Sequence, residues 1–158
     1  MTDFTIREAT SKDLPAIRTL WLKVDDFHRG LTLKLPRPEA PAKQWSDSFE
    51  GALGKTTFLW VAEMGGSIEG FLLARLKRLP AYLGEANVGE IADLYVDKEA
   101  RGQKVAVSLA ETAIEALRGH NVHSIEIQIM AGNHGGLAFW HKQGFHTELT
   151  QVRLVVGK

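Results

Sequence analysis

The sequence contains no cysteine, which excludes disulfides, cysteine-ligated zinc and a thiol nucleophile. It has no apolar run approaching the roughly 20 residues that a membrane-spanning helix needs. The first residues, Met1 to Arg7, also lack the apolar core of a signal peptide. We therefore expect a cytoplasmic protein without a membrane partner.

Neither sign of charge is in excess, because 19 Lys and Arg residues balance 19 Asp and Glu residues. A net charge of zero argues against broad electrostatic binding to nucleic acid. The six histidines form no metal-binding signature such as H-E-x-x-H, so no metal is expected. A length of 158 residues predicts a single domain, residues 1–158, that is large enough to bury a core.

Hydrophobic periodicity and turn residues predict an alternation of strands and helices. Expected helices begin at Thr10 or Ser11, cover 42–53 and 105–117, and run from Asn133 to Gln143. Expected strands cover 4–8, 57–63, 67–78, 91–96 and 122–130, with one or two more in 145–156. Hairpins precede the β-α-β units, which predicts an α/β (α+β) fold with a mixed sheet and helices on both faces.

The most informative segment is a strand that runs through a polar turn into a helix. The apolar strand residues stop at Asp97, a turn follows over 98–104, and helical spacing begins at Val105. A turn that opens directly onto a helix presents unpaired backbone N–H groups at the positive end of the helix dipole. This arrangement favours an anion and predicts a phosphate-bearing ligand.

Two motifs within this element order resemble the GNAT superfamily of acyl-CoA-dependent N-acyltransferases. The turn Arg101-Gly-Gln-Lys-Val-Ala106 is similar to the coenzyme A turn of the family, except that Lys104 replaces a glycine. The segment Asn133-His-Gly-Gly-Leu-Ala-Phe-Trp-His-Lys-Gln-Gly-Phe145 is similar to a later family motif, with Trp140 where a tyrosine is frequent. The resemblance covers essentially the whole chain and implies a mostly antiparallel sheet of six to seven strands flanked by about four helices.

The resemblance implies an acetyl-CoA-dependent enzyme that uses acetyl-CoA as co-substrate. Backbone amides of 102–106 would hold the pyrophosphate, and the strand at 94–96 would pair with the pantetheine arm and polarise the thioester. If position 104 has a positive φ, lysine there costs ~1 kcal/mol relative to glycine. The implied coenzyme A contacts are Leu94, Tyr95, Val96, Arg101, Gly102, Gln103, Lys104, Val105, Ala106, Asn133 and Phe139.

The implied catalytic residues are Glu90, Asp93 and Trp140. Glu90 is the first candidate base, although simple strand alternation puts it on the opposite face from Asp93 unless a β-bulge intervenes. Glu85 is a less favoured base. An indole N–H is not a usable proton source near neutral pH, so Trp140 is expected to pack against the ligand or the core. Proton donors left open for the thiolate are water, and the side chains of His141 and Tyr95.

Acidic residues near an aromatic ring would suit an amine acceptor. The candidates are Asp25, Asp26, His28, Trp45, Asp47 and Glu50, whose alternative interpretation is a polar helical surface. The acceptor is either a small-molecule amine or a protein or peptide amine, and a homodimer is left open. Two other functions compete: a regulatory or vestigial CoA-binding module with little catalysis, and a structural domain without a nucleotide ligand.

Overall fold

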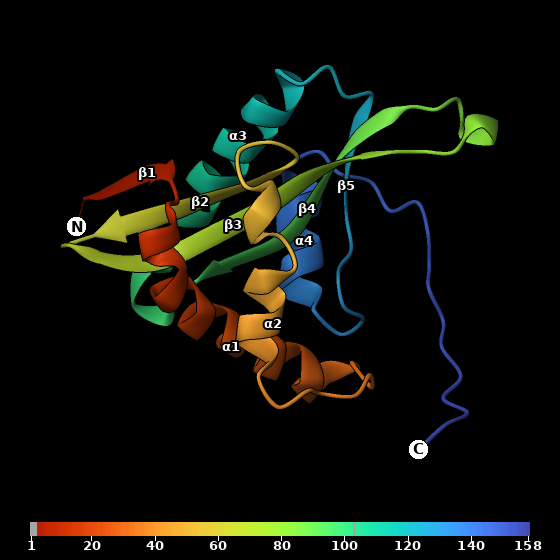
Figure 1. The fold of residues 1–158 in the computed structure, drawn as a ribbon, viewed down its shortest axis with the longest axis horizontal. Coiled ribbons are helices and arrows are strands. Elements are labelled where there is room, and N and C mark those ends of the chain that lie inside the picture. The colour runs from red at the N-terminus through yellow and green to blue at the C-terminus, as the bar shows by residue number, and fades with distance from the viewer. Residues whose placement is uncertain (1–2, 103) are drawn as a thin grey trace.

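The computed structural model describes residues 3–102 and 104–158 and shows a five-stranded sheet in the order β1-β2-β3-β4-β5. Neighbouring strands are antiparallel except for the parallel pair β4–β5 (Figure 1). The strands are β1 Phe4–Glu8, β2 Thr57–Met64, β3 Ser67–Arg78, β4 Asn87–Val96 and β5 Ser124–Ile127; the α-helices are α1 Leu14–Leu31, α2 Pro41–Asp47, α3 Val105–Arg118 and α4 His134–Lys142.

Helices cover both faces of the sheet, as the sequence predicts (Figure 1). On one face, α1 and α2 pack on β2 and β3 around the buried side chains of Ile17, Val61 and Phe71. On the other, Leu109 of α3 and Trp140 of α4 belong to a larger apolar cluster. Side chains at alternate strand positions therefore pack into two separate cores, one on each face of the sheet, and β4 contributes to both.

The start of the chain is fastened by an ion-pair cluster. The guanidinium of Arg7 on β1 donates two hydrogen bonds of 2.9 Å to the Asp13 carboxylate, just before α1. The same carboxylate accepts a 2.7 Å hydrogen bond from the backbone N–H of Thr10, which supports the predicted helix start. The hydrogen bonds from Arg7 are the main reason that the pKa of Asp13 falls to about 2.

The prediction of six to seven strands is wrong, since the sheet of the described residues has five. No residue from 145 to 156 lies in a strand: the chain turns at Gly144, where φ is 98°, and runs away from the sheet (Figure 1). The strand expected over 122–130 is shorter, because β5 pairs with β4 only from Ser124 to Ile127. The helix expected over 42–53 ends at Asp47, where the chain bends and buries Phe49, and a short 3-10 turn follows.

A β-bulge in β4 shapes the middle of the sheet. Leu73 of β3 lies opposite Asp93, but the next residue, Ala74, lies opposite Ile91, so Ala92 is the extra residue. Beyond Ile91, β4 also loses its partner β5 and keeps only β3. The stretch from Ala92 to Val96 therefore combines a change of side-chain direction with an edge that the described strands leave open.

Candidate active site

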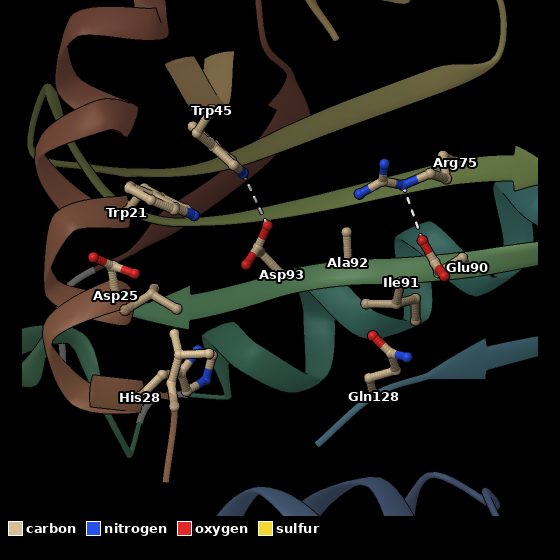
Figure 2. A pocket seen from close by; sticks show the side chains of 12 residues that line it. Trp21, Asp25, His28, Trp45, Arg75, Glu90, Ile91, Ala92, Asp93 and Gln128 are labelled. Carbon is tan, nitrogen blue, oxygen red and sulfur yellow. Dashed lines mark hydrogen bonds and ion pairs between the residues drawn. The ribbon is translucent and has the colours of Figure 1, made fainter. Parts of the chain in front are cut away.

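A cavity of about 280 Å³ lies between α1, α2 and the middle of β4. Figure 2 shows side chains from both helices and from the sheet converging on it. The residues that line it are Trp21, Val24, Asp25, His28, Leu33, Trp45, Arg75, Glu90, Ile91, Ala92, Asp93 and Gln128.

The bulge places two carboxylates in this one cavity. Regular alternation would direct Glu90 and Asp93 to opposite faces of the sheet, but the extra residue Ala92 shifts the pattern by one. Both side chains consequently line the cavity on the α1 and α2 side. The sequence analysis named both residues, and the structure shows how they come together.

Asp93 is held in a setting that favours the protonated acid. Burial raises the pKa of its carboxyl to about 7, against the lowering effects of a hydrogen bond from Trp45 and the charge of Arg75. Trp45 Nε1 donates that hydrogen bond to Oδ2 over 3.2 Å (Figure 2). A carboxyl with a pKa near 7 can accept and release a proton at neutral pH.

Glu90, at the other end of the cavity, is surrounded by cations. Its Oε1 lies 3.0 Å from Nε of Arg75, as an ion pair rather than an aligned hydrogen bond. Its Oε2 accepts a hydrogen bond of 3.3 Å from Lys77, which also pairs with Glu126 on β5. These pairs engage both oxygens of Glu90.

The wall opposite the sheet is aromatic. Trp21 of α1 and Trp45 of α2 stack with ring centroids 5.3 Å apart. Beside them Asp25, whose side chain is only 6% exposed, pairs with Arg29 and Arg37. Burial lowers the pKa of His28, which favours the neutral imidazole at neutral pH.

The turn before α3 has the backbone shape of an anion-binding loop. Gly102 and Lys104 both have positive φ values, 83° and 64°, and α3 begins at Val105 without a side-chain cap from Lys104. Arg101 folds back instead: its Nε donates to the Val96 carbonyl over 2.8 Å. Among the described residues no side chain caps this helix start, so the first α3 amides can face an anion.

The other predicted coenzyme A contacts before α4 lie on the last residues of β4 and in the first turn of α3. Leu94 and Tyr95 are half-buried on the open stretch of β4, next to the buried Val96. Val105 is buried and Ala106 half-buried in the first turn of α3. Gln103 lies outside the described residues.

Residues of the later motif mainly build α4 and the core. Asn133 caps α4 by accepting a 2.9 Å hydrogen bond from the Gly136 amide. Trp140 is 4% exposed, packs edge-on against Phe139 and Phe145, and is not among the cavity residues. Of the two settings expected for Trp140, the ligand or the core, the structure shows the core.

The alternative proton-transfer candidates lie apart from the cavity. Glu85 pairs with Arg78 at the exposed end of the β3–β4 hairpin. His141 is exposed and lies 3.1 Å from the Thr147 hydroxyl. The Tyr95 hydroxyl donates to Asp97 over 3.4 Å, and burial raises its pKa.

Residues 18–145 match the Acetyltransferase (GNAT) family. The chain belongs to this family. Over 144 residues it is 25% identical to an uncharacterized N-acetyltransferase of Methanocaldococcus jannaschii; the match covers 90% of this chain and 60% of that protein. The GNAT superfamily resemblance found in the sequence is thereby confirmed.

Solved structures share the GNAT fold at low identity. A variant of a Bacillus halodurans protein has a TM-score of 0.80 at 23% identity, covering 96% of this chain and 99% of that one. A Clostridium acetobutylicum protein, described as a predicted acetyltransferase with acetyl-CoA, has a TM-score of 0.79 at 18% identity, covering 98% and 97%. These likenesses support the fold, and the family match makes the chain an acetyltransferase-family protein.

Of the acceptor-side candidates named from the sequence, Asp25, His28 and Trp45 line the cavity, and Asp26, Asp47 and Glu50 do not. Trp21, Arg75 and Gln128 also line the cavity, and the sequence analysis did not name them as site residues. The sequence feature that could have identified Arg75 is a charged residue within the apolar strand β3, because such a residue needs a partner.

In the described part of the chain, no group of three or more potential ligands could hold a metal, and no helix has the length and hydropathy to cross a membrane.

Proposed function

We propose that this protein transfers an acetyl group from acetyl-CoA to a primary amine by direct attack. The observation that carries the proposal is the Asp93 carboxyl, which has a pKa of about 7. Asp93 lines a cavity that lies beside the open edge of β4. The proposal includes the single domain of residues 1–158 and a cytoplasmic location.

The turn before α3 fits the pyrophosphate of acetyl-CoA. Positive φ values at Gly102 and Lys104 turn the backbone ahead of an uncapped helix start, and a Cβ on Gly102 would meet nothing within 4 Å. The open edge between Ala92 and Val96 offers main-chain groups to the pantetheine arm. Acetyl-CoA, when bound, supplies an acetyl group activated as a thioester.

Asp93 acts as the base in this proposal. Its ionised carboxylate accepts a proton from the acceptor ammonium, and the amine nitrogen then bonds to the acetyl carbon as the thiolate leaves. The nitrogen loses its second proton to solvent, from which the thiolate can also be protonated. Glu90, which was the first candidate in the sequence, helps to hold Arg75 beside Asp93.

The cavity favours a small amine with an apolar body. Trp21, Val24 and Leu33 line a space of only about 280 Å³ next to the Asp93 carboxyl. The loop that carries Leu33 is tied down, because Arg29 donates to the Leu35 carbonyl over 2.6 Å and Thr32 donates to the Ala131 carbonyl over 3.1 Å. A protein or peptide amine is the alternative acceptor.

The test combines turnover with binding. Thiol release from acetyl-CoA is followed with a thiol reagent across small aryl-alkyl amines, aliphatic diamines and lysine peptides; the chain has no cysteine to add background. We expect release with the aryl-alkyl amines and a higher melting temperature with acetyl-CoA, since a ligand that binds only the native state stabilises it. Binding without release on any amine would favour the regulatory or vestigial module, for which Lys104 and Trp140 are the supporting departures. Absence of binding would contradict both.

A further inference from the structure

A guanidinium in the cavity has donors without acceptors. Of the described residues that line the cavity, Arg75 of β3 is the one arginine. Its Nε is buried without an aligned hydrogen-bond partner, although Oε1 of Glu90 lies 3.0 Å away. Its two terminal nitrogens donate no hydrogen bond to the described residues, and Figure 2 shows them directed along the cavity towards Asp93. Donors of this kind fit an anionic group of a ligand.

The other cationic side chains nearby are engaged with carboxylates. Arg29 and Arg37 both pair with the buried side chain of Asp25. Lys77 pairs with Glu126 and is not among the residues that line the cavity. Among the described residues, an anion that enters the cavity therefore meets one guanidinium with free donors, the one on β3.

The acidic and the basic group of the cavity lie side by side. Asp93 pairs with Leu73 in the register between β4 and β3, and Arg75 is two residues beyond Leu73 on β3. Side chains two positions apart on a strand point to the same face of the sheet. The charge of Arg75 reaches the neighbouring carboxyl, since it opposes the rise in the pKa of Asp93. A ligand with a positive and a negative group a few atoms apart matches this pair.

We propose that the acceptor is an amine that carries a carboxylate, and that Arg75 binds this carboxylate while the ammonium faces Asp93. The inference rests on the proposed function, because it identifies the class of amine that the same site takes. A planar carboxylate matches the paired donors of a guanidinium. The amide of Gln128, which lines the cavity from the segment after β5, is a further donor (Figure 2).

The charge and the shape of the cavity favour the same class of ligand. A zwitterion brings no net charge into a partly buried site, whereas a plain ammonium leaves its charge to be balanced by the protein. The stacked rings of Trp21 and Trp45 and the side chain of Leu33 suit an apolar body on the ligand. Amino acids with aromatic or other apolar side chains combine these features.

The first test compares L-phenylalanine with its methyl ester, which keeps the amine and the ring but removes the negative charge. The measured quantity is kcat/KM for the acid divided by kcat/KM for the ester. We expect this ratio to fall about ten- to a hundredfold in Arg75→Gln, because a charged hydrogen-bonded pair is lost. Arg75→Lys should show a smaller fall, because lysine keeps the charge but not the paired donors.

The matched control is Lys77→Gln. It removes the other cation beside Glu90, one that does not line the cavity, so the ratio should change by less than about threefold. Comparing each variant with the wild type cancels the difference in reactivity between the two amines. Equal losses with acid and ester in Arg75→Gln would make Arg75 a positioning residue for Asp93. That result would overturn the carboxylate site and leave the proposed function standing.

The second test measures binding without turnover. Calorimetry with 3-phenylpropanoate, which has the carboxylate but no amine, should show binding to the wild type and at least about tenfold weaker binding to Arg75→Gln. If this loss is found and no amine is acetylated, the carboxylate site is supported and the proposed function is wrong. If 3-phenylpropanoate binds both proteins equally, or neither, the carboxylate site is wrong whatever the turnover.

Discussion

The two ends of the cavity each carry a carboxylate of β4, and their surroundings differ. At one end, Glu90 is paired with Arg75 and Lys77. At the other, Asp93 accepts a hydrogen bond from the neutral Trp45 indole, and burial raises its pKa to about 7. The cations occupy both oxygens of Glu90, whereas the buried Asp93 carboxyl with its raised pKa can exchange protons at neutral pH. This difference is why we propose electrostatic support for Glu90 and proton transfer for Asp93.

Removing the base end of the cavity should have the largest effect. Asp93→Asn is expected to lower kcat by about 10²–10⁴-fold, the usual contribution of a general base. The measurement is kcat against pH: the wild-type rate should rise with pH through about 7 as Asp93 ionises, and the variant should lose this step. Acetyl-CoA affinity should be retained.

The same variant has a stability signature that shows whether it folds. Because the pKa of Asp93 is raised in the fold, the native state loses stability as pH rises from the unfolded value towards about 7. Asp93→Asn removes this loss, so its melting temperature should exceed that of the wild type above pH 7. A low melting temperature at every pH would instead indicate a structural role for Asp93.

Neutralising the paired end should have a smaller effect. Glu90→Gln keeps the size of the side chain and removes the partner of two cations, and we expect kcat to fall by less than about tenfold, because Asp93 remains as the base. The decisive quantity is the ratio of the two losses at one pH. A larger loss in Glu90→Gln than in Asp93→Asn would reverse the two roles.

Removing the hydrogen bond from Trp45 to Asp93 should shift the profile of kcat against pH and leave the maximum rate unchanged. The bond from Trp45 lowers the pKa of Asp93, so Trp45→Phe should shift the acidic limb to higher pH by up to about one unit. Trp21→Phe is the matched control, since it alters the same aromatic stack without touching that bond. Equal shifts in both variants would assign the effect to packing.

Changes at the turn before α3 should leave the profile alone and act on binding and stability. Ala106→Asp is expected to weaken acetyl-CoA binding more than Lys104→Gly does, because a carboxylate at the helix start repels a pyrophosphate. Lys104→Gly relieves a positive φ and should raise the free energy of unfolding by up to about 1 kcal/mol. Calorimetry and chemical denaturation measure the two effects; a stronger binding loss in Lys104→Gly would contradict the role of the backbone amides.

Local patterns were enough to predict most elements of the fold. The helix starts expected at Thr10 or Ser11 and at Asn133 depend on neighbouring residues, and both are in the structure. Lys104 has the positive φ that the sequence analysis treated as a condition. The strand expected after Phe145 was wrong, because its β-type pattern has no partner strand within the chain as described. A pattern gives the propensity to be a strand, but pairing decides whether one forms.

The sequence indicated which carboxylates to consider, but not the directions in which their side chains point. Glu90 and Asp93 were identified, yet only the pairing register between β3 and β4 shows that Ala92 is an extra residue. The pKa of Asp93 is raised by burial beneath other elements, against the lowering effects of Trp45 and Arg75. Contacts between separate elements cannot be read from the sequence, so the sequence could not show which of Glu90 and Asp93 is the better candidate base.

The hydrogen bond from Trp45 to Asp93 gives the resting protein an optical signal of its own. Indole emission responds to a charge at its N–H, so protonation of the neighbouring carboxyl should alter the Trp45 fluorescence near pH 7. The other three tryptophans do not share this bond: Trp21 stacks on Trp45, and Trp60 and Trp140 lie in the opposite core. A fluorescence titration would thus read the ionisation of one side chain without substrate, label or turnover.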